Sequence, residues 1–521
     1  MKRRFFILFL PLALLAATGA GRSWWSLVEE LSSEKYEGRA TASEGYRKAA
    51  EFVAGQFERL RLKPAATGGY LLPVRFQVRR IREAESSLKL IRGGVQEWLE
   101  LGEDAYFTLN IEAGGTLRAP AVFVGYGLTV PERNYDDLAG LDLKGKIAVF
   151  LRGGPASIPG TLRAHYQSAS ERTAFLRKAG VIGTVSILDP KTMDVPWQRL
   201  RLLRLEPFFT LEDVSAGENA GLKLAVTVNP DKAERWFTGS GYSFEEILKL
   251  AGEGSSLPRF PLAYEVQAEV ALDRSTAQCS NVAAVIPGRD SRLRNEYVVL
   301  SAHLDHLGIS ENGGSRTLFP GAMDNAAGVA SLLEVARQLR SAPPRRSVLL
   351  VALTGEEKGL LGSRHFTANP PVPLSSIVAD LNLDMFLPIH ELRWLTVYGL
   401  EESSLGRDAE AVARSLGIKI QTDPQPERNI FIRSDQYNFI RAGIPALSFR
   451  FGFEKGSPEE QLHLDWLRNR YHGGADDASQ PVNLAAAARF NRFIAALVAR
   501  VADSASRPAW NPESFFRRFA R

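Results

Sequence analysis

The chain has 521 residues, which is more than one ordinary hydrophobic core holds, so we expect two or three domains. Its 45% hydrophobic and 24% charged residues are typical of a soluble globular protein. The formal net charge is +5, and three of the positive charges belong to Lys2, Arg3 and Arg4. The rest of the chain therefore carries +2, and no run of Lys and Arg alternates with aromatic residues. These features argue against a nucleic-acid partner.

The first twenty residues have the pattern of a signal peptide. The basic cluster precedes the apolar run 5–17 and then Ala20, with the small Thr18 two residues before it. Such a run suits a signal peptide and is too short to cross a bilayer. We expect residues 1–20 to be removed and the protein to be secreted or periplasmic, with a short membrane anchor as the alternative. No later stretch is long and apolar enough for stable membrane insertion.

The chain has one cysteine, Cys279, so it forms no internal disulfide and no cysteine-based zinc site. A metal ion would have to bind His, Asp and Glu side chains. Cys279 lies just before the apolar run 281–286, which favours a half-buried structural thiol over a nucleophile.

In chain order, the first predicted element is an amphipathic helix at 43–60, followed by strand-like segments up to residue 117. From residue 118 the sequence is rich in strands and turns, with strands at 121–126, 146–152 and 184–188 and a helix at 171–180. The stretch "AGEGSSLPRFP" around residue 252 has the composition of a linker. We therefore divide the mature chain into 21–117, a β-rich module at 118–255, a domain at 256–505 and a tail at 506–521.

From residue 281 strands alternate with loops and helices. Helices are predicted at 325–340, 360–367 and 485–501. The predicted strands are 281–286, 297–302, 347–353, 377–383, 394–398 and 446–451. This alternation indicates an α/β fold in which a mixed sheet is sandwiched by helices. In such sheets functional groups gather beyond the carboxyl ends of the strands.

Polar side chains stand at those strand ends. His303 and Asp305 follow one strand, Glu356-Glu357 follows another, and Asp384 follows a third. Asp324 comes just before the predicted helix 325–340, and a later loop carries His472. Histidine and carboxylate without thiol suit zinc or another divalent first-row ion.

Each of these residues also has an ordinary structural interpretation. Asp324 could cap a helix, and Glu356-Glu357 could be the acidic first turn of the helix at 360–367. His303 and His472 taken singly could be core or surface histidines. Asp384, however, follows an apolar strand and would be a costly buried carboxylate without a cation. All the ordinary interpretations would have to hold together, which disfavours them as a set.

The same residues lie in a series of motifs. In chain order these are "SAHLDHLG", "GAMDNAAGVASLLEVAR", "TGEEKGLLGS", "LNLDM" and "YHGGADD". As a set they resemble the co-catalytic zinc aminopeptidases of the M28 family, over roughly residues 280–500 and the earlier segment "EGYRKAAEFVAGQF". The block "VFVGYGLTVPERNYDDLAGLDLKGKIAVFLRGGP" resembles the protease-associated domain that is often inserted in these enzymes. The resemblance implies the zinc-peptidase fold with a β-rich insertion.

The resemblance also implies roles for the motif residues. His303 and Asp384 would bind one zinc ion, Glu357 and His472 a second, and Asp324 would bridge both. Glu356 would be the general base, and Asp305 would orient His303. The sequence departs from the family at Gln436, where histidine is common, and at Gly473-Gly474, where Thr-Pro is frequent. No ligand position remains for the other histidines, namely His165, His306, His365, His390 and His463.

We therefore predict a secreted zinc-dependent exopeptidase that removes N-terminal residues from peptides with two Zn²⁺ ions per chain. One alternative is a carboxypeptidase or dipeptidase on the same scaffold, with Arg433 or Arg450 binding the substrate carboxylate. A second is a glutaminyl-cyclase-like acyltransferase, which needs one zinc only. A third is a non-catalytic binding module, against which the complete ligand set argues. Side-chain specificity and oligomeric state are left open.

Overall fold

The computed structural model describes residues 9–521, apart from 113, 194, 214–220, 312–314 and 429. The chain forms two compact units. The first unit comprises Met1–Val74, Gln278–Pro424 and Arg433–Arg521, and the second comprises Arg75–Ala277 and Gln425–Ile432. All the predicted site residues lie in the first unit.

The first unit is built on a mixed sheet, as predicted. Its strands run in the order β14–β18–β15–β19–β22–β20–β21, and β1 pairs with β14. The pairs β18–β15, β15–β19 and β19–β22 are parallel, whereas β14–β18 and β22–β20 are antiparallel. The bounds are β1 Lys63–Pro64, β14 Leu272–Ile286, β15 Tyr297–His303, β18 Ser347–Leu353, β19 Ile377–Asn382, β20 Trp394–Tyr398, β21 Lys419–Gln421 and β22 Ala446–Gly452. β15, β18, β19, β20 and β22 agree with the predicted strands to within one residue, whereas β14 starts well before the predicted residue 281 and β21 was not predicted.

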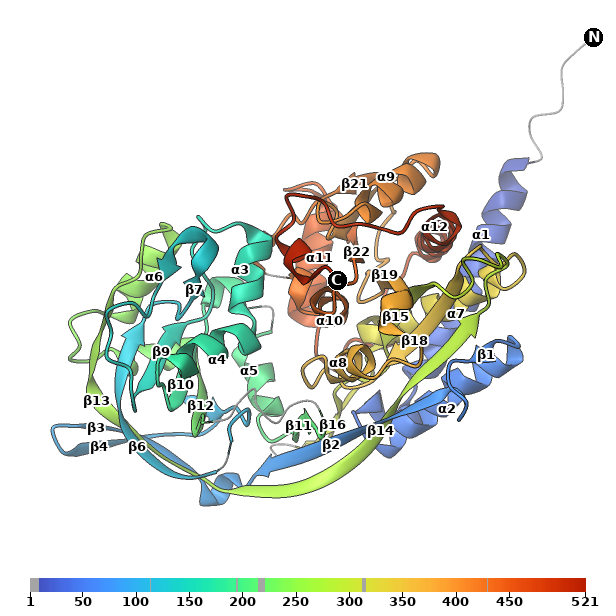
Figure 1. The fold of residues 1–521 in the computed structure, drawn as a ribbon. Coiled ribbons are helices and arrows are strands. Elements are labelled where there is room, and N and C mark those ends of the chain that lie inside the picture. The colour runs from blue at the N-terminus through green and yellow to red at the C-terminus, as the bar shows by residue number, and fades with distance from the viewer. Residues whose placement is uncertain (1–8, 113, 194, 214–220, 312–314, 429) are drawn as a thin grey trace, which may run out of the picture. The chain divides into compact units, whose positions relative to one another are not determined.

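The central strands are buried along almost their whole length because helices cover both faces of the sheet. Every residue of β18 is buried, which is the pattern of a parallel strand enclosed on two sides. α7 and α12 pack against β15 and β18, and α10 packs against β19 and β22. Figure 1 shows α1, α7 and α12 on one side of these strands and α8 and α10 on the other. The bounds are α1 Phe9–Leu31, α7 Ala327–Leu339, α8 Leu361–Ala368, α10 Gln436–Arg441 and α12 Leu484–Asp503.

The predicted signal peptide lies partly outside the described residues, and the rest of it belongs to α1. Its expected end at Ala20 falls within this helix. Trp24 and Val28, farther along α1, are fully buried, and the indole Nε1 of Trp24 donates a hydrogen bond to the carbonyl of Ala327 at 3.2 Å. No helix among the described residues combines the length and apolar character needed to cross a membrane.

Further helices complete the first unit. Ser43 caps the helix predicted at 43–60 by accepting a hydrogen bond from the backbone N–H of Tyr46. The remaining bounds are α2 Glu44–Arg59, α9 Leu405–Ser415 and α11 Pro458–Asn469.

The second unit has its own mixed sheet and core. Its strands run in the order β4–β3–β13–β6–β9–β10–β12–β5. The pairs β6–β9, β9–β10 and β10–β12 are parallel. Val124, Phe150, Leu176 and Val181 form part of its core. The bounds are β3 Ser87–Arg92, β4 Val95–Leu99, β5 Ala105–Phe107, β6 Gly115–Val124, β9 Ile147–Leu151, β10 Gly183–Ile187, β12 Leu224–Val228, β13 Arg259–Val270, α3 Gly160–Gln167, α4 Ala169–Lys178, α5 Trp197–Leu200 and α6 Phe244–Gly252.

This unit is wider than the β-rich module predicted at 118–255. β3 precedes that range and β13 follows it, and both belong to the same sheet as β6. The expected linker near residue 252 leads directly into β13 and then into β14, which starts in the second unit and ends in the first. Within the second unit, β11 (Phe208–Leu211) pairs with β2 (Leu71–Ile81).

Candidate metal centre

The parallel strands bring the predicted residues to one edge of the sheet. His303 is the last residue of β15, Glu356 and Glu357 follow β18, and Asp384 follows β19. Because β15 is parallel to both β18 and β19, the carboxyl ends of these three strands meet at this edge. Asp324 lies in the turn Ala322–Ala326 (η8) before α7, and His472 lies in the loop after α11.

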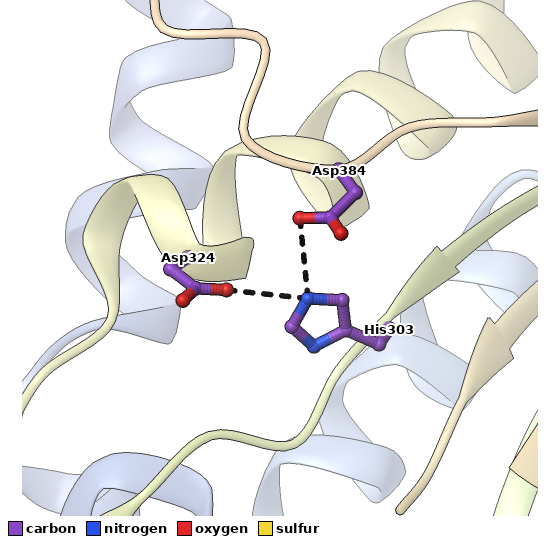
Figure 2. Close-up of side chains that lie close together, drawn as sticks. All are labelled: His303, Asp324 and Asp384. Carbon is purple, nitrogen blue, oxygen red and sulfur yellow. Dashed lines mark ion pairs between the residues drawn. The ribbon is translucent and has the colours of Figure 1, made fainter. Parts of the chain in front are cut away.

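A first cluster joins His303, Asp324 and Asp384. Figure 2 shows the imidazole between the two carboxylates, with Nε2 of His303 3.2 Å from Oδ1 of Asp324 and 3.5 Å from Oδ1 of Asp384. Nδ1 of His303 lies 3.0 Å from the main-chain carbonyl of Asp305, which can only accept, so Nδ1 carries the proton. Nε2 is therefore the ring nitrogen left for a metal ion, and it faces the two carboxylates.

A second cluster shares Asp324 with the first. Nε2 of His472 lies 3.3 Å from Oδ2 of Asp324 and 3.3 Å from Oε2 of Glu357. Asp324 thus presents Oδ1 to His303 and Oδ2 to His472. One carboxylate placed between two sets of ligands has the arrangement of a bridging ligand.

His306 also lies in the second cluster, although the sequence analysis left no ligand position for it. Its side chain is fully buried, and Nδ1 lies 2.7 Å from Oε1 of Glu357 and 3.8 Å from Oδ2 of Asp324. His306, Asp324 and Glu357 together form a group able to hold a metal ion. The signal in the sequence was the spacing His-Leu-Asp-His, in which His306 directly follows Asp305.

Asp305 supports the site in a different way from the one predicted. Its main-chain carbonyl, and not its carboxylate, is the partner of His303, because Oδ1 lies 4.0 Å from Nδ1. The carboxylate instead accepts hydrogen bonds from the Thr41 hydroxyl at 2.7 Å and from the backbone N–H of Glu356 at 3.1 Å. Asp305 therefore links the His303 loop to the Glu356-Glu357 loop.

Two further side chains fix the turn that carries Asp324. The carboxylate of Asp476 accepts hydrogen bonds from the backbone N–H groups of Met323 at 2.9 Å and Asp324 at 3.0 Å. Asn325, which follows Asp324 through a cis peptide bond, donates to the carbonyl of Leu383 at 2.8 Å. The turn is thereby tied to both the His472 loop and the Asp384 loop.

Gln436, the position at which the family commonly has histidine, is buried beside this edge of the sheet. Its side-chain oxygen accepts a hydrogen bond from Asn382 at 2.7 Å. Asn382 is the last residue of β19, two positions before Asp384. The departure from the family pattern therefore concerns a residue that supports the Asp384 loop.

The charges of the cluster attract one another strongly. Burial alone lowers the pKa of His303 and His472, but the nearby carboxylates outweigh it, raising the pKa of His303 well above its usual value and that of His472 to about 10. Burial raises the pKa of Asp324, but His303, His306 and His472 bring it well below its usual value. Burial likewise raises the pKa of Glu357, and His472 with His306 lowers it below its usual range. The carboxylates thus draw positive charge into the cluster.

Glu356 differs from its neighbour. Burial raises the pKa of its carboxyl well above the usual value, and the negative charges of Asp384 and Glu357 add to the rise, although His303 opposes it. A carboxyl group whose pKa is raised suits a group that accepts and returns a proton.

The residues fit a divalent metal ion. Three ligand-type atoms of the two clusters are buried and have no hydrogen-bond partner among the described residues, namely Nε2 of His303, Nε2 of His306 and Oδ1 of Asp384. Buried polar atoms left without partners are costly, and a cation at this place would satisfy them. Imidazole nitrogen and carboxylate oxygen are the donors that zinc accepts in sites without thiolate.

Comparisons with known proteins point to the same chemistry. Residues 281–498 match the family described as Peptidase family M28. The alkaline phosphatase isozyme conversion protein of Escherichia coli is 32% identical over 167 residues, which are 29% of this chain and 48% of that protein. Aminopeptidase YwaD of Bacillus subtilis is 28% identical over 186 residues, which are 35% of this chain and 36% of that protein. The chain thus spans less than half the length of these curated relatives.

Solved structures extend the likeness to almost the whole chain. An aminopeptidase from Aneurinibacillus sp. strain AM-1 superposes with a TM-score of 0.56 at 19% identity, covering 95% of this chain and 97% of that one. A zinc aminopeptidase from Bacillus subtilis, solved at medium resolution, gives a TM-score of 0.50 at 18% identity over 94% of this chain and 96% of that one. The chain is therefore similar to the M28 peptidases in sequence over residues 281–498, and it shares the fold of a bacterial aminopeptidase.

Proposed function

We propose that the protein is a two-zinc aminopeptidase of the M28 type that acts outside the cytoplasm. The observation that carries the proposal is the position of Asp324, whose two oxygens face two separate clusters of histidine and carboxylate. His303 and Asp384 would hold one zinc ion, and Glu357 and His472 the other. Two zinc ions would polarise the scissile carbonyl and make a bound water more acidic.

Glu356 is the proposed general base. It lies next to Glu357 in the chain and after the buried strand β18, so it reaches the same edge of the sheet without being needed as a ligand. Its carboxylate would take a proton from the attacking water and return it to the leaving amine, which is typical work for a glutamate with a raised pKa. The second unit, proposed to be a protease-associated domain, is not needed for this step because it contributes no proposed ligand.

A substrate panel tests the proposal. Aminoacyl-amides with a free amine, their N-acetylated counterparts and peptides with a free carboxylate are incubated with zinc-loaded and chelator-treated protein. We expect cleavage of the free-amine substrates alone, lost with chelator and regained with Zn²⁺. Cleavage of N-blocked peptides at the carboxyl end would instead indicate a carboxypeptidase. Zinc binding without hydrolysis of any substrate would indicate a binding module.

N-terminal sequencing of protein recovered from outside the cytoplasm tests the localisation. A start near Gly21 is expected if residues 1–20 are a signal peptide. An intact Met1 in the membrane fraction would indicate an anchor instead.

A further inference from the structure

Arg39 lies beside the candidate metal centre, although it is more than 250 residues away in sequence from the first proposed ligand. Arg39 follows α1 by eight residues, and its side chain is fully buried although it carries a charge. Nη1 donates to the carbonyl of Leu31 at 2.6 Å, at the end of α1. This hydrogen bond ties the guanidinium to the end of α1, and its other donors face the loops of the candidate site.

The remaining donors of Arg39 bind two of the segments that carry proposed ligands. Nε donates to the carbonyl of Leu304 at 2.8 Å, directly after His303. Nη1 and Nη2 donate to the carbonyls of Pro320 and Gly321, each at 2.8 Å, four and three residues before Asp324. One planar group thus joins the backbone beside His303 to the backbone beside Asp324.

The residues on either side of Arg39 make the same connection. The backbone N–H of His306 donates to the carbonyl of Arg39 at 3.1 Å, and the Thr41 hydroxyl donates to Asp305. Gly38 has a positive φ of 66°, and a Cβ there would come within 2.4 Å of the Phe319 carbonyl and 2.5 Å of the Gly308 carbonyl. Only glycine allows the chain to pass so closely between the two loops.

The charge of Arg39 also suits this place. Burial lowers the pKa of its guanidinium to about 10, so it stays cationic at neutral pH, and the carboxylates of Asp476, Asp324, Asp305 and Glu357 oppose the lowering. A fixed positive charge beside so many carboxylates reduces their mutual repulsion. Its hydrogen bonds go to carbonyl groups, so the carboxylates remain available to a metal ion.

We propose that Arg39 is a positioning residue for zinc, one that fixes the His303 loop and the Asp324 turn at the separation that metal binding requires. The inference rests on the proposed function, because it assumes that these residues bind zinc. Guanidinium is suited to the task because it offers five N–H donors in one rigid plane, whereas the lysine ammonium is a single point with three. Without Arg39, four carbonyl groups lose a partner, and the two segments keep the pairing of β16 (Gly308–Ser310) with β17 (Thr317–Phe319) but lose the guanidinium that joins them.

The experiment compares Arg39→Met with a matched control, Arg346→Met. Arg346 is equally buried, with its side chain 1% exposed, and hydrogen-bonds to Glu296 at 2.6 Å. It directly precedes β18 and so lies at the other end of that strand from Glu356. Zinc affinity is measured on metal-free protein by titration calorimetry, zinc content by mass spectrometry, and the unfolding midpoint of the metal-free protein by calorimetry.

Both methionine variants should unfold at a lower temperature than the wild type when metal-free. Only Arg39→Met should bind zinc more weakly, by about 10- to 100-fold, the usual effect of removing a group that supports metal ligands. Equal zinc affinity in Arg39→Met and the wild type would overturn the inference, and so would an equal loss of zinc affinity in Arg346→Met. If the wild type binds no zinc, the result contradicts the proposed function, and with it the inference on Arg39.

Arg39→Lys and Thr41→Val carry the test if Arg39→Met does not fold. Lysine keeps the charge and loses the planar fork, so Arg39→Lys should fold and still bind zinc several-fold more weakly. Thr41→Val keeps the shape of the side chain and removes the donor to Asp305, and it should weaken zinc binding in the same direction. Wild-type affinity in both folded variants would show that the segment serves folding alone.

Discussion

At the scale of single residues, Glu356 and Glu357 are adjacent in the chain but face different surroundings. The carboxylate of Glu357 lies beside His306 and His472, and its pKa is lowered because the charge of His472 and the hydrogen bonds from both histidines outweigh its burial. The pKa of Glu356 is raised, because burial and neighbouring carboxylates outweigh the attraction of His303. Two residues of one chemical type therefore suit opposite tasks, holding a cation and exchanging a proton.

The two glutamates should fail in different ways when each is changed to glutamine. Glu356→Gln removes the base and keeps its shape, so zinc content should stay near the wild-type value while kcat falls by about 10²- to 10⁴-fold. Glu357→Gln replaces a charged ligand by a neutral one, so one zinc ion should be lost and added Zn²⁺ should restore part of the activity. Mass spectrometry and kinetics on both variants check this. Loss of zinc from Glu356→Gln alone would reverse the two roles.

His306 offers a second test at this scale. His306→Ala removes the partner of Glu357 Oε1, and we expect the affinity for the second zinc ion to fall by about 10- to 100-fold. His390→Ala is the matched control, because His390 contacts Phe451 and the Glu391 carbonyl and lies in neither cluster. Stepwise zinc titration separates the two ions. Unchanged zinc affinity in His306→Ala would show that this histidine contributes to packing and not to zinc binding.

Cys279 should be unreactive in the folded protein. It is buried against the Thr354 hydroxyl at 3.1 Å, and burial raises its pKa to about 11 from a usual value of 9.0. Because the thiolate is the reactive form, its fraction at pH 8 falls by roughly a hundredfold. Alkylation by iodoacetamide at pH 8 should be much slower in native protein than in urea-unfolded protein. Equal rates would contradict the burial of this thiol.

At the scale of elements, the parallel strands were predictable and the residues that support them were not. Apolar runs ending in His303, Glu356-Glu357 and Asp384 mark the carboxyl ends of three strands, and parallel pairing places those ends together. β13 was not predicted, and its first residues fell in the stretch "AGEGSSLPRFP" that was expected to be a linker. Its strand character comes from pairing with β3 and β6, which are distant in sequence, and composition does not reveal such partners.

α1 should contribute to the stability of the first unit through Trp24. The indole is fully buried, lies 5.7 Å from the ring of Phe386 and donates a hydrogen bond to Ala327. Trp24→Ala should therefore lower the free energy of unfolding by about 3–5 kcal/mol. Trp98→Ala is the control, because Trp98 is 60% exposed on β4 and its loss should cost less than about 1 kcal/mol. Urea denaturation checks both, and equal effects would contradict the packing of α1.

At the scale of the whole molecule, zinc should stabilise the protein as well as activate it. A ligand that binds the folded state alone adds about 2.7 kcal/mol at a hundred times its Kd. Calorimetry should therefore show a lower unfolding temperature after chelation and recovery with added Zn²⁺. The variant His303→Ala/His472→Ala should show no such recovery. Recovery in that variant as large as in the wild type would place the bound zinc elsewhere.

The sequence predicted the five ligands together because each stands in a motif that follows a strand or precedes a helix. It did not predict the contribution of Arg39, since nothing near "EGRATAS" indicates which loops a buried guanidinium will meet. It also excluded His306, because the five predicted ligands left no position for it. Contacts between segments more than 250 residues apart depend on the folded chain, and their partners carry no local pattern.

The clamp made by Arg39 bears on how the protein can be divided. A recombinant fragment of residues 281–498, the part that matches the peptidase family, would contain every proposed ligand. It would begin inside β14 and would lack Trp24, Arg39 and Thr41. Such a fragment has all the proposed ligands, yet the carbonyl groups of Leu304, Pro320 and Gly321 would lose the hydrogen bonds that Arg39 donates. A fragment that keeps this clamp and the packing of Trp24 has to start before residue 24, far upstream of the first proposed metal-binding side chain.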